Sequence, residues 1–201
     1  MRLHSYVVRF DSGFAPNPFY GYCTLATCKP SIRRSAAIDD WIVGSGSNDR
    51  TVRRGGYLVY AMRVTEALSF REYDADPRFQ RKKPYRRGSR KQSCGDNIYF
   101  RNAADTGWEQ RDSFHSNSDG TANPKHITRD TGTDRVLVSD DYVYSGGDGP
   151  PFPQALRNVC KSGIGQSCCS DPELIDRFVE WVRSMNAGYQ AAPFEWRSLR
   201  G

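Results

Sequence analysis

The chain has 201 residues and a formal net charge of +6, and 37% of its residues are hydrophobic and 26% charged. A chain of this length usually forms one domain, so we expect a single domain over residues 1–201. No apolar run approaches the roughly 20 residues that a membrane-spanning helix needs, and the opening residues MRLHSYVVRFD lack the order of a secretory signal. The composition therefore indicates a polar, globular, cytoplasmic protein without a membrane partner, and the positive charge favours a polyanionic partner.

The first third of the chain predicts three strands and a short helix. Residues 6–10, YVVRF, have the composition of a strand that ends at a turn. Pro30 suits the first turn of a helix over residues 31–38. A strand is expected over residues 41–43, closed by the run GSGS, and a buried strand over residues 57–64, YLVYAMRV.

Two polar segments follow. Residues 78–91, RFQRKKPYRRGSRK, hold eight Lys or Arg and predict an exposed basic loop inserted into the domain. A short strand is expected over residues 97–100. Residues 106–131 are so rich in Asp, Asn, Ser and Gly that we expect an irregular loop, either functional or mobile.

The last third predicts two strands and a helix. Residues 135–138 and 142–144 have strand composition. A C-terminal helix over residues 171–185 is indicated by Asp171 as the cap, Pro172 at the first position and apolar residues three or four apart. The order of these elements predicts a mixed α/β (α+β) fold.

Six cysteines carry no Cys-x-x-Cys spacing, which is the usual signature of a structural zinc site. A cytoplasmic domain of this size needs no disulfides, so we expect free thiols. We predict no cofactor and no metal, and the one metal set that stays open is His115, His126 and Asp130. The cysteines are Cys23, Cys28, Cys94, Cys160, Cys168 and Cys169.

The stretch of residues 13–34, GFAPNPFYGYCTLATCKPSIRR, is the first candidate ligand site because it directly follows a strand. Its aromatic rings are suited to stacking on a base, and the amide of Asn17 is suited to pairing with a base edge. The alternative is a structural loop with buried aromatics. The turn at residues 44–47 is a second wall for the same cavity, or an ordinary hairpin connection.

A nucleophilic thiol is a further possibility. Cys28 is followed by Lys29, whose positive charge favours the thiolate. A catalytic cysteine needs a base, and the histidines are His4, His115 and His126, of which the last two lie in the irregular segment and are able to reach a pocket. His115 is our candidate base, and Asp96 is a further candidate acid, base or nucleophile. The alternative is that the cysteines are chemically inert.

The basic segment 78–91 interleaves Tyr85 with arginines, a pattern that suits phosphate contact combined with base stacking. The alternative is a solvated loop. The candidate contacts to a nucleic-acid backbone are Arg33, Arg34, Arg81, Lys82, Lys83, Arg86 and Arg87.

The blocks VVRFDSGFAPNPFYGYCTLATCKPSIRR, DDWIVGSGS, YLVYAMRVTEALSFREYDADPRF, GDNIYF and DRVLVSDDYVYSG follow one another in this order. Together they resemble the bacterial and phage family called nucleotide-modification-associated domain, type 2, over about residues 6–146. The chain has Asp-Asp-Trp at residues 39–41 where the family has Gly-Asp-Trp, and the basic insert is its own. The resemblance implies a DNA-modification or defence system, with other proteins of that system as partners.

The same block order is also similar to the PUA-like folds of EVE and YTH domains, which hold a modified base between the loop after one strand and the end of the next. This analogy implies a small mixed β-barrel or sheet with flanking helices. Carried onto this chain, it implies ligand contacts from Asn17, Phe19, Tyr22, Cys23, Thr24, Lys29, Trp41, Ser45, Gly46 and Ser47.

We therefore expect recognition of a modified base or nucleotide, in DNA or free, with its phosphates held by the basic segment. An enzyme of nucleotide or base modification, using Cys28, His115 or Asp96 in the same pocket, is the alternative. A protein-interaction subunit of such a system is the third hypothesis.

Overall fold

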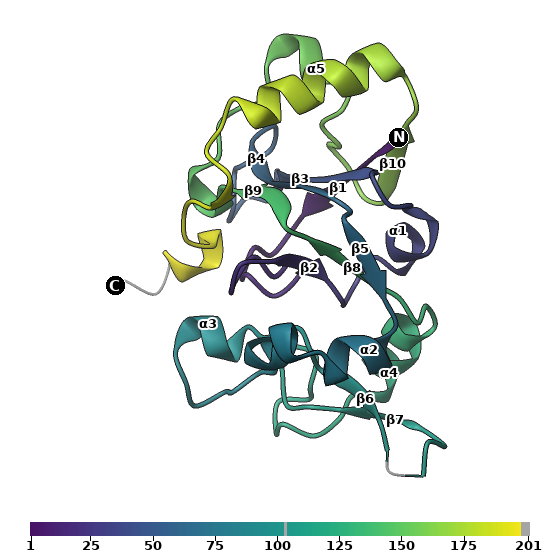
Figure 1. Ribbon diagram of the computed structural model, residues 1–201. Coiled ribbons are helices and arrows are strands. Elements are labelled where there is room, and N and C mark those ends of the chain that lie inside the picture. Colours follow the sequence, from purple (N-terminus) through teal and green to yellow (C-terminus); the bar gives the residue numbers. More distant parts are fainter. Residues whose placement is uncertain (103, 198–201) are drawn as a thin grey trace. The chain divides into compact units, whose positions relative to one another are not determined.

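The computed structural model describes residues 1–102 and 104–197, and their contacts group them into two compact units (Figure 1). Unit 1 contains Met1–Ser12, Ala36–Thr65 and the residues from Ser139 onward. Unit 2 contains Gly13–Ser35 and Glu66–Val138. The chain therefore leaves unit 1 twice, and each excursion contributes one part of unit 2.

Unit 1 is built on an open six-stranded sheet with the order β10-β1-β3-β4-β9-β11. β1 runs parallel to β3 and β11 parallel to β9, while the other neighbours are antiparallel. The strands are β1 (Leu3–Val8), β3 (Trp41–Gly46), β4 (Leu58–Arg63), β9 (Asp141–Tyr144), β10 (Gln166–Cys169) and β11 (Gly188–Tyr189).

Helix α5 (Pro172–Arg183) packs on the sheet of unit 1 and falls within the segment 171–185 for which a helix was predicted (Figure 1). The Asp171 carboxylate accepts hydrogen bonds from the free backbone N–H groups of the first turn, as an N-cap does. Phe178 is buried on the inner face, with its ring centroid 6.0 Å from that of Trp41. Three short 3₁₀ turns complete the unit: η2 (Gly146–Asp148), η3 (Gln154–Leu156) and η4 (Phe194–Trp196).

Strand β3 is longer than the predicted 41–43 because it includes the Gly-Ser-Gly run that the sequence suggested as a turn. Side-chain packing explains why residue 44 is a glycine. A Cβ on Gly44 would lie 2.5 Å from the side chain of Tyr60 on the neighbouring strand, so glycine is required for the ring to lie against the backbone.

Unit 2 has a three-stranded sheet of order β2-β8-β5, a two-stranded hairpin β6-β7 and short helices. Its hydrophobic core contains Phe14, Phe70, Tyr73 and Tyr99, all almost fully buried. The elements are β2 (Cys23–Leu25), α1 (Pro30–Ser35), β5 (Glu66–Leu68), α2 (Phe70–Ala75), η1 (Pro77–Lys82), α3 (Arg90–Ser93), β6 (Tyr99–Arg101), β7 (Trp108–Gln110), α4 (Pro124–Thr131) and β8 (Val136–Ser139).

Both polar segments contain more regular structure than their composition suggested. The basic segment 78–91 overlaps η1 and α3, and Phe79 is buried in the core of unit 2. Segment 106–131 contains β7 and α4, the latter capped by the Asn123 side chain and started by Pro124. Capping residues and single buried aromatics therefore outweigh a polar average composition.

The mixed α+β class predicted from the sequence is confirmed. The strands of the large sheet lie in linear order with β10 and β11 at its edges, so this sheet does not close into the barrel that the PUA-like analogy allowed. No helix in the part of the chain that the structure describes has the length and apolar character needed to cross a membrane.

Candidate active site

Cys28 lies in unit 2 between strand β2 and helix α1, at an unusual point of the backbone. Its φ angle is 60° and that of Lys29 is 42°, so both residues adopt the left-handed region that non-glycine residues rarely occupy. Such conformations cost on the order of 1–3 kcal/mol each and persist only where surrounding contacts hold them. One such contact is the hydrogen bond from the Cys28 backbone N–H to the Asp130 carboxylate.

The Cys28 thiol faces an imidazole. Its Sγ lies 3.4 Å from His115 Nε2, within hydrogen-bond distance, and 4.0 Å from Arg129 Nη2. Cys28 is partly exposed, whereas His115 is buried. A thiol that is open to solvent on one side and contacts a base on the other has the arrangement of a cysteine nucleophile.

Asp130, at the end of helix α4, orients the imidazole from the opposite side. Its Oδ2 lies 2.9 Å from His115 Nδ1. The fully buried carboxylate also accepts hydrogen bonds from the Tyr99 hydroxyl at 2.8 Å, Arg129 Nε at 2.9 Å and the Cys28 backbone N–H at 3.2 Å. These donors satisfy a buried negative charge that would otherwise be costly.

The surroundings lower the pKa of Asp130 and raise the pKa of His115. Burial raises the pKa of Asp130, but the hydrogen bonds from His115 and Arg129 outweigh it and hold this pKa well below its ordinary value. Burial lowers the pKa of His115, but the hydrogen bonds to Asp130 and Cys28 outweigh it, so this pKa lies above its ordinary value. Asp130 is therefore an anion at neutral pH and stabilises the protonated imidazole.

Two rings fix the plane of the His115 side chain. The Phe14 centroid lies 4.8 Å from that of His115, and the His126 centroid lies 4.3 Å from it, both edge-to-face. Burial lowers the pKa of His126, and the charges of His115 and Arg129 lower it further. His126 thus packs as a neutral ring against His115.

Arg33 in helix α1 ties the Cys28 turn to the segment that follows Asp130. Its Nε donates to the Cys28 carbonyl at 2.9 Å, and its Nη atoms donate to the carbonyls of Asp130, Thr133 and Arg135 at 2.6 to 2.8 Å. The side chain is fully buried. Because the guanidinium fork uses its donors on four carbonyls, Arg33 positions the site from inside the core.

Cys28, His115 and Asp130 are thus linked in the order nucleophile, base and orienting carboxylate. This is the relationship of residues in cysteine and serine catalytic triads, which are recognised by geometry and not by sequence order. The Arg129 guanidinium lies 4.0 Å from the Cys28 sulfur and pairs with Asp130 at 2.9 Å, so it places a positive charge beside the thiol. The arrangement is able to perform nucleophilic attack on an acyl carbon.

The third catalytic candidate from the sequence, Asp96, lies elsewhere in unit 2. It is fully buried, and it accepts hydrogen bonds from the hydroxyls of Thr24 and Tyr73, both at 2.7 Å. Burial raises the pKa of Asp96, and the positive charge of Lys82 opposes this. Asp96 therefore belongs to a buried polar cluster of the core.

The predicted ligand residues at the start of unit 2 are also buried. The Asn17 amide nitrogen donates to the Gly13 and Cys94 carbonyls, and its oxygen accepts a 2.7 Å hydrogen bond from Lys82 Nζ. Cys23, Thr24 and Phe19 are almost fully buried, whereas Tyr22 and Lys29 are partly exposed. Burial lowers the pKa of Lys82 to about 8.

The predicted second wall, residues 45–47, belongs to unit 1 together with Trp41. Ser45 Oγ donates to the Lys161 carbonyl at 2.6 Å, and Trp41 is buried under α5. Ser47 Oγ accepts a hydrogen bond from the Asp49 backbone N–H. Their role in binding a base stays a prediction.

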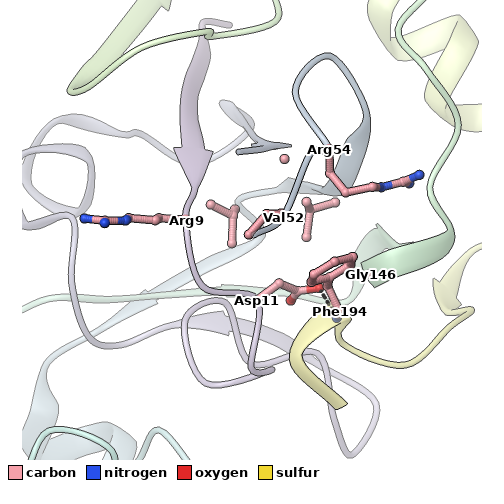
Figure 2. A pocket seen from close by; sticks show the side chains of 9 residues that line it. Arg9, Asp11, Val52, Arg54, Gly146 and Phe194 are labelled. Carbon is pink, nitrogen blue, oxygen red and sulfur yellow. Dashed lines mark hydrogen bonds between the residues drawn. The ribbon is translucent and has the colours of Figure 1, made fainter. Parts of the chain in front are cut away.

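Gly46 lines a small cavity in unit 1 between the end of β1 and η4 (Figure 2). Its volume is about 10 Å³, which is room for roughly one water molecule and far too little for a base. In Figure 2 the side chains of Arg9 and Arg54 extend away from the cavity, while the Asp11 carboxylate points to the Phe194 backbone. This cavity is therefore not a ligand site for a nucleotide.

The basic candidates divide into buried and exposed side chains. Lys82 and Arg33 are fully buried and hydrogen-bonded, and Lys83 pairs with Asp74 at 2.9 Å. The exposed ones are Arg34, Arg81, Arg86 and Arg87.

Sequence reasoning missed three parts of the site: Asp130 as the partner of His115, and Tyr99 and Arg129 as its neighbours. Asp130 had been considered only as a metal ligand together with His115 and His126. Within residues 1–102 and 104–197, no group of three or more His, Cys, Asp or Glu side chains is arranged to hold a metal ion. The Asn123-Pro124 helix start was the one local signal that could have placed Asp130 at a helix end.

These observations define a mixed α+β protein with a cysteine, a histidine and an aspartate linked in sequence by close contacts. The family model described as "Nucleotide modification associated domain 2" matches residues 1–200, and the chain belongs to this family. The resemblance predicted from the sequence is confirmed and covers nearly the whole chain. The family's description associates the chain with nucleotide-modification systems. No curated protein and no solved structure matches it.

Proposed function

We propose that this protein is a thiol enzyme of a nucleotide-modification system, which cleaves or transfers an acyl group carried by a nucleotide. The observation that carries the proposal is the contact chain from Cys28 Sγ to His115 Nε2 at 3.4 Å and from His115 Nδ1 to Asp130 Oδ2 at 2.9 Å. The family membership supports a nucleotide as the substrate class.

In the proposed reaction the Cys28 sulfur bonds to the carbonyl carbon of an amide or ester on the nucleotide, and the thiol proton passes to His115 Nε2. The π electrons of the carbonyl move to its oxygen, beside Arg129. When the tetrahedral intermediate collapses, the C–N or C–O bond breaks and the leaving atom takes the proton from His115. Water then attacks the thioester with His115 as base, which releases a carboxylic acid and restores the thiol.

Asp130 contributes by holding His115 in one tautomer. With Nδ1–H directed to the carboxylate, Nε2 is the nitrogen that accepts the thiol proton, and Arg129 Nη2 lies 3.5 Å from the same nitrogen. The Tyr99 hydroxyl supports the same carboxylate from the core of unit 2. The charged and polar groups around His115 are therefore in place before a substrate binds.

A second candidate function is recognition of a modified base without chemistry, as the sequence led us to expect. The observation that favours it is the pairing of basic and aromatic side chains in unit 2. The Arg81 guanidinium lies 4.3 Å from the ring centroid of Tyr20, and Lys91 Nζ lies 5.7 Å from that of Phe19. A role as a protein-interaction subunit also stays a prediction.

The decisive experiment incubates the protein with nucleotides and short oligonucleotides whose bases carry amide or ester groups. The nucleotide products and the intact protein mass are both followed. We expect a released acyl product and a transient acyl adduct on Cys28, both lost in Cys28→Ser and His115→Ala. Cys168→Ser is the matched control, because Cys168 is exposed and lies in unit 1. Binding of a modified nucleotide with neither product nor adduct across the panel would favour the recognition function instead.

A further inference from the structure

Unit 2 carries a groove of about 470 Å³ that lies outside the residues of the thiol site. This volume is within the range of ligand-binding clefts, and the groove is open to solvent along its outer side. Three arginines and one carboxylate give the groove a positive charge. Its lining residues are Pro84, Tyr85, Arg86, Arg87, Arg111 and Asp112.

The arginines of the groove differ in how firmly they are held. Arg111 is fixed by Asp74, with Nη2 2.8 Å from the carboxylate, and stacks 4.2 Å from the Phe100 centroid. Arg86 has a loose ion pair, 3.9 Å from Asp112. Arg87 is exposed and has no ion-pair partner among the described residues. Arg86 also donates a long 3.4 Å hydrogen bond to the Ser93 carbonyl. Because its contacts are long and Arg87 is exposed, both are available to phosphate, with Arg111 as a fixed positive charge in the same groove.

Two large aromatic side chains are exposed at this surface, Tyr85 in the lining of the groove and Phe114 beside its Arg86. Tyr85 is 57% exposed and Phe114 is 45% exposed, although rings of this size are normally buried. The Arg86 guanidinium lies 4.5 Å from the Phe114 ring centroid. Exposed rings between arginines form the combination on which unpaired bases stack while their phosphates are neutralised.

The groove connects directly to the catalytic base. Phe114 immediately precedes His115 in the chain, and Phe14 contacts both rings, with centroid distances of 5.7 Å to Phe114 and 4.8 Å to His115. Arg111 and Asp112 of the groove lie on the same segment, four and three residues before His115, respectively. A ligand in the groove thus lies on the loop that holds the base of the thiol site.

We propose that this groove binds single-stranded nucleic acid, with phosphates on Arg86 and Arg87 and unpaired bases on Tyr85 and Phe114. A single strand is favoured over a duplex because a duplex hides the base faces that exposed rings need. The groove then delivers one nucleotide of the strand to Cys28. Only this last step rests on the proposed function, which it deepens by naming a strand as the substrate.

The test measures the binding of a fluorescent single-stranded oligonucleotide by anisotropy at several salt concentrations, with the full chain. We expect Arg86→Ala/Arg87→Ala to weaken binding at least tenfold and to reduce the salt slope by about 1.4, because each phosphate contact on a single strand contributes roughly 0.7. Tyr85→Ala should weaken binding about tenfold, in the range measured for one base stacked on an aromatic ring. The matched control is Arg50→Ala/Arg53→Ala, which removes two exposed arginines from unit 1 and should leave binding unchanged.

Three competitors identify the ligand. We expect an unlabelled single strand to displace the probe, while a duplex of the same sequence and a mononucleotide compete at least tenfold less well. Equal loss of binding in the groove variant and the control variant would overturn the proposal, as would a mononucleotide that competes as well as the strand.

The outcome is independent of the thiol chemistry. Cys28→Ser should bind the oligonucleotide as the unmodified protein does, and the groove variant should retain the reaction of Cys28 with iodoacetamide. If the Arg86→Ala/Arg87→Ala variant loses strand binding but keeps the reaction of Cys28 with iodoacetamide, the groove proposal is supported. If the unmodified protein binds the strand but its Cys28 does not react, the result counts against the proposed function and not against the groove.

Discussion

His115 Nδ1 lies 2.9 Å from Asp130 Oδ2, and the carboxylate is fully buried. This buried anion keeps a proton on Nδ1. Nε2 is then the nitrogen that faces the thiol of Cys28 and accepts its proton. The chemistry proposed for the site depends on this pair of residues.

Cys28 should be the cysteine that reacts fastest with iodoacetamide at neutral pH, although Cys168 is more exposed. The reason is that the His115 imidazole is in contact with the Cys28 sulfur and is positioned to take its proton. Peptide mapping by mass spectrometry gives the rate at each cysteine. In His115→Ala the rate at Cys28 should fall at least tenfold and the rate at Cys168 should stay the same. Modification of Cys168 before Cys28 would contradict the assigned base.

The pKa of His115 should lie above 6.5 in the folded protein and fall in Asp130→Asn. Since the folded-state pKa is raised, the stability that this group contributes is complete below the unfolded value of 6.5 and is lost as the pH rises through the folded value. NMR titration of the His115 ring proton checks the pKa directly. His126, whose pKa is lowered, is the internal reference and should shift less. An unchanged His115 titration in Asp130→Asn would rule out the carboxylate as its main partner.

Arg33→Met should destabilise the protein by about 3 kcal/mol or more in urea unfolding, because four carbonyls lose a charged donor inside the core. The neighbouring Arg34 is exposed, so Arg34→Met is the matched control and should cost less than about 1 kcal/mol. The reaction of Cys28 with iodoacetamide should also slow in Arg33→Met under folding conditions, since the Cys28 carbonyl is one of the four. Equal losses of unfolding free energy in Arg33→Met and Arg34→Met would show that the buried hydrogen bonds of the Arg33 guanidinium add no stability.

The buried carboxylate of Asp11 should make the stability of unit 1 depend on pH between about 4 and 6. Burial raises the pKa of Asp11 to about 6, with hydrogen bonds from the Tyr144 hydroxyl and the Phe194 backbone opposing the rise. Figure 2 shows the bond between the Asp11 carboxylate and Phe194. Because this pKa is raised from 3.8, the contribution is complete below pH 3.8 and lost as the pH rises through 6, a difference of about 3 kcal/mol.

Amide exchange at Phe194 should therefore accelerate as the pH rises from 4 to 7 by more than the intrinsic chemistry of exchange requires. Asp11→Asn removes the titration and should abolish the excess. Asp49→Asn is the control, since Asp49 lies in the same unit but its hydrogen bonds from Thr51 lower its pKa, so it is already ionised across this pH range. An excess that survives in Asp11→Asn would assign the pH dependence to another group.

The sequence predicted local elements well where one signal acted alone. Asp171 and Pro172 start α5, and the apolar run of residues 57–64 contains β4. It failed where packing opposed local propensity. Gly44 looked like a turn residue, and only the Tyr60 ring beside it explains why glycine lies within a strand.

The candidate site was predictable only in part. Cys28 and His115 were identified by residue type, because thiols and imidazoles are few. Asp130 could not be chosen among 23 acidic residues without knowing that α4 ends beside His115. Lys82 and Arg33 looked like surface charges in sequence, but their burial depends on acceptors 60 or more residues away.

The two excursions of the chain into unit 2 also set an order of events during synthesis. Cys28 belongs to the first excursion, while His115 and Asp130 belong to the second. A nascent chain therefore exposes the thiol roughly 100 residues before its base and carboxylate have left the ribosome, about 5–20 seconds at ordinary rates of translation. During that interval neither His115 nor Asp130 is available, so the proposed thiol chemistry cannot begin until the second excursion has been synthesised.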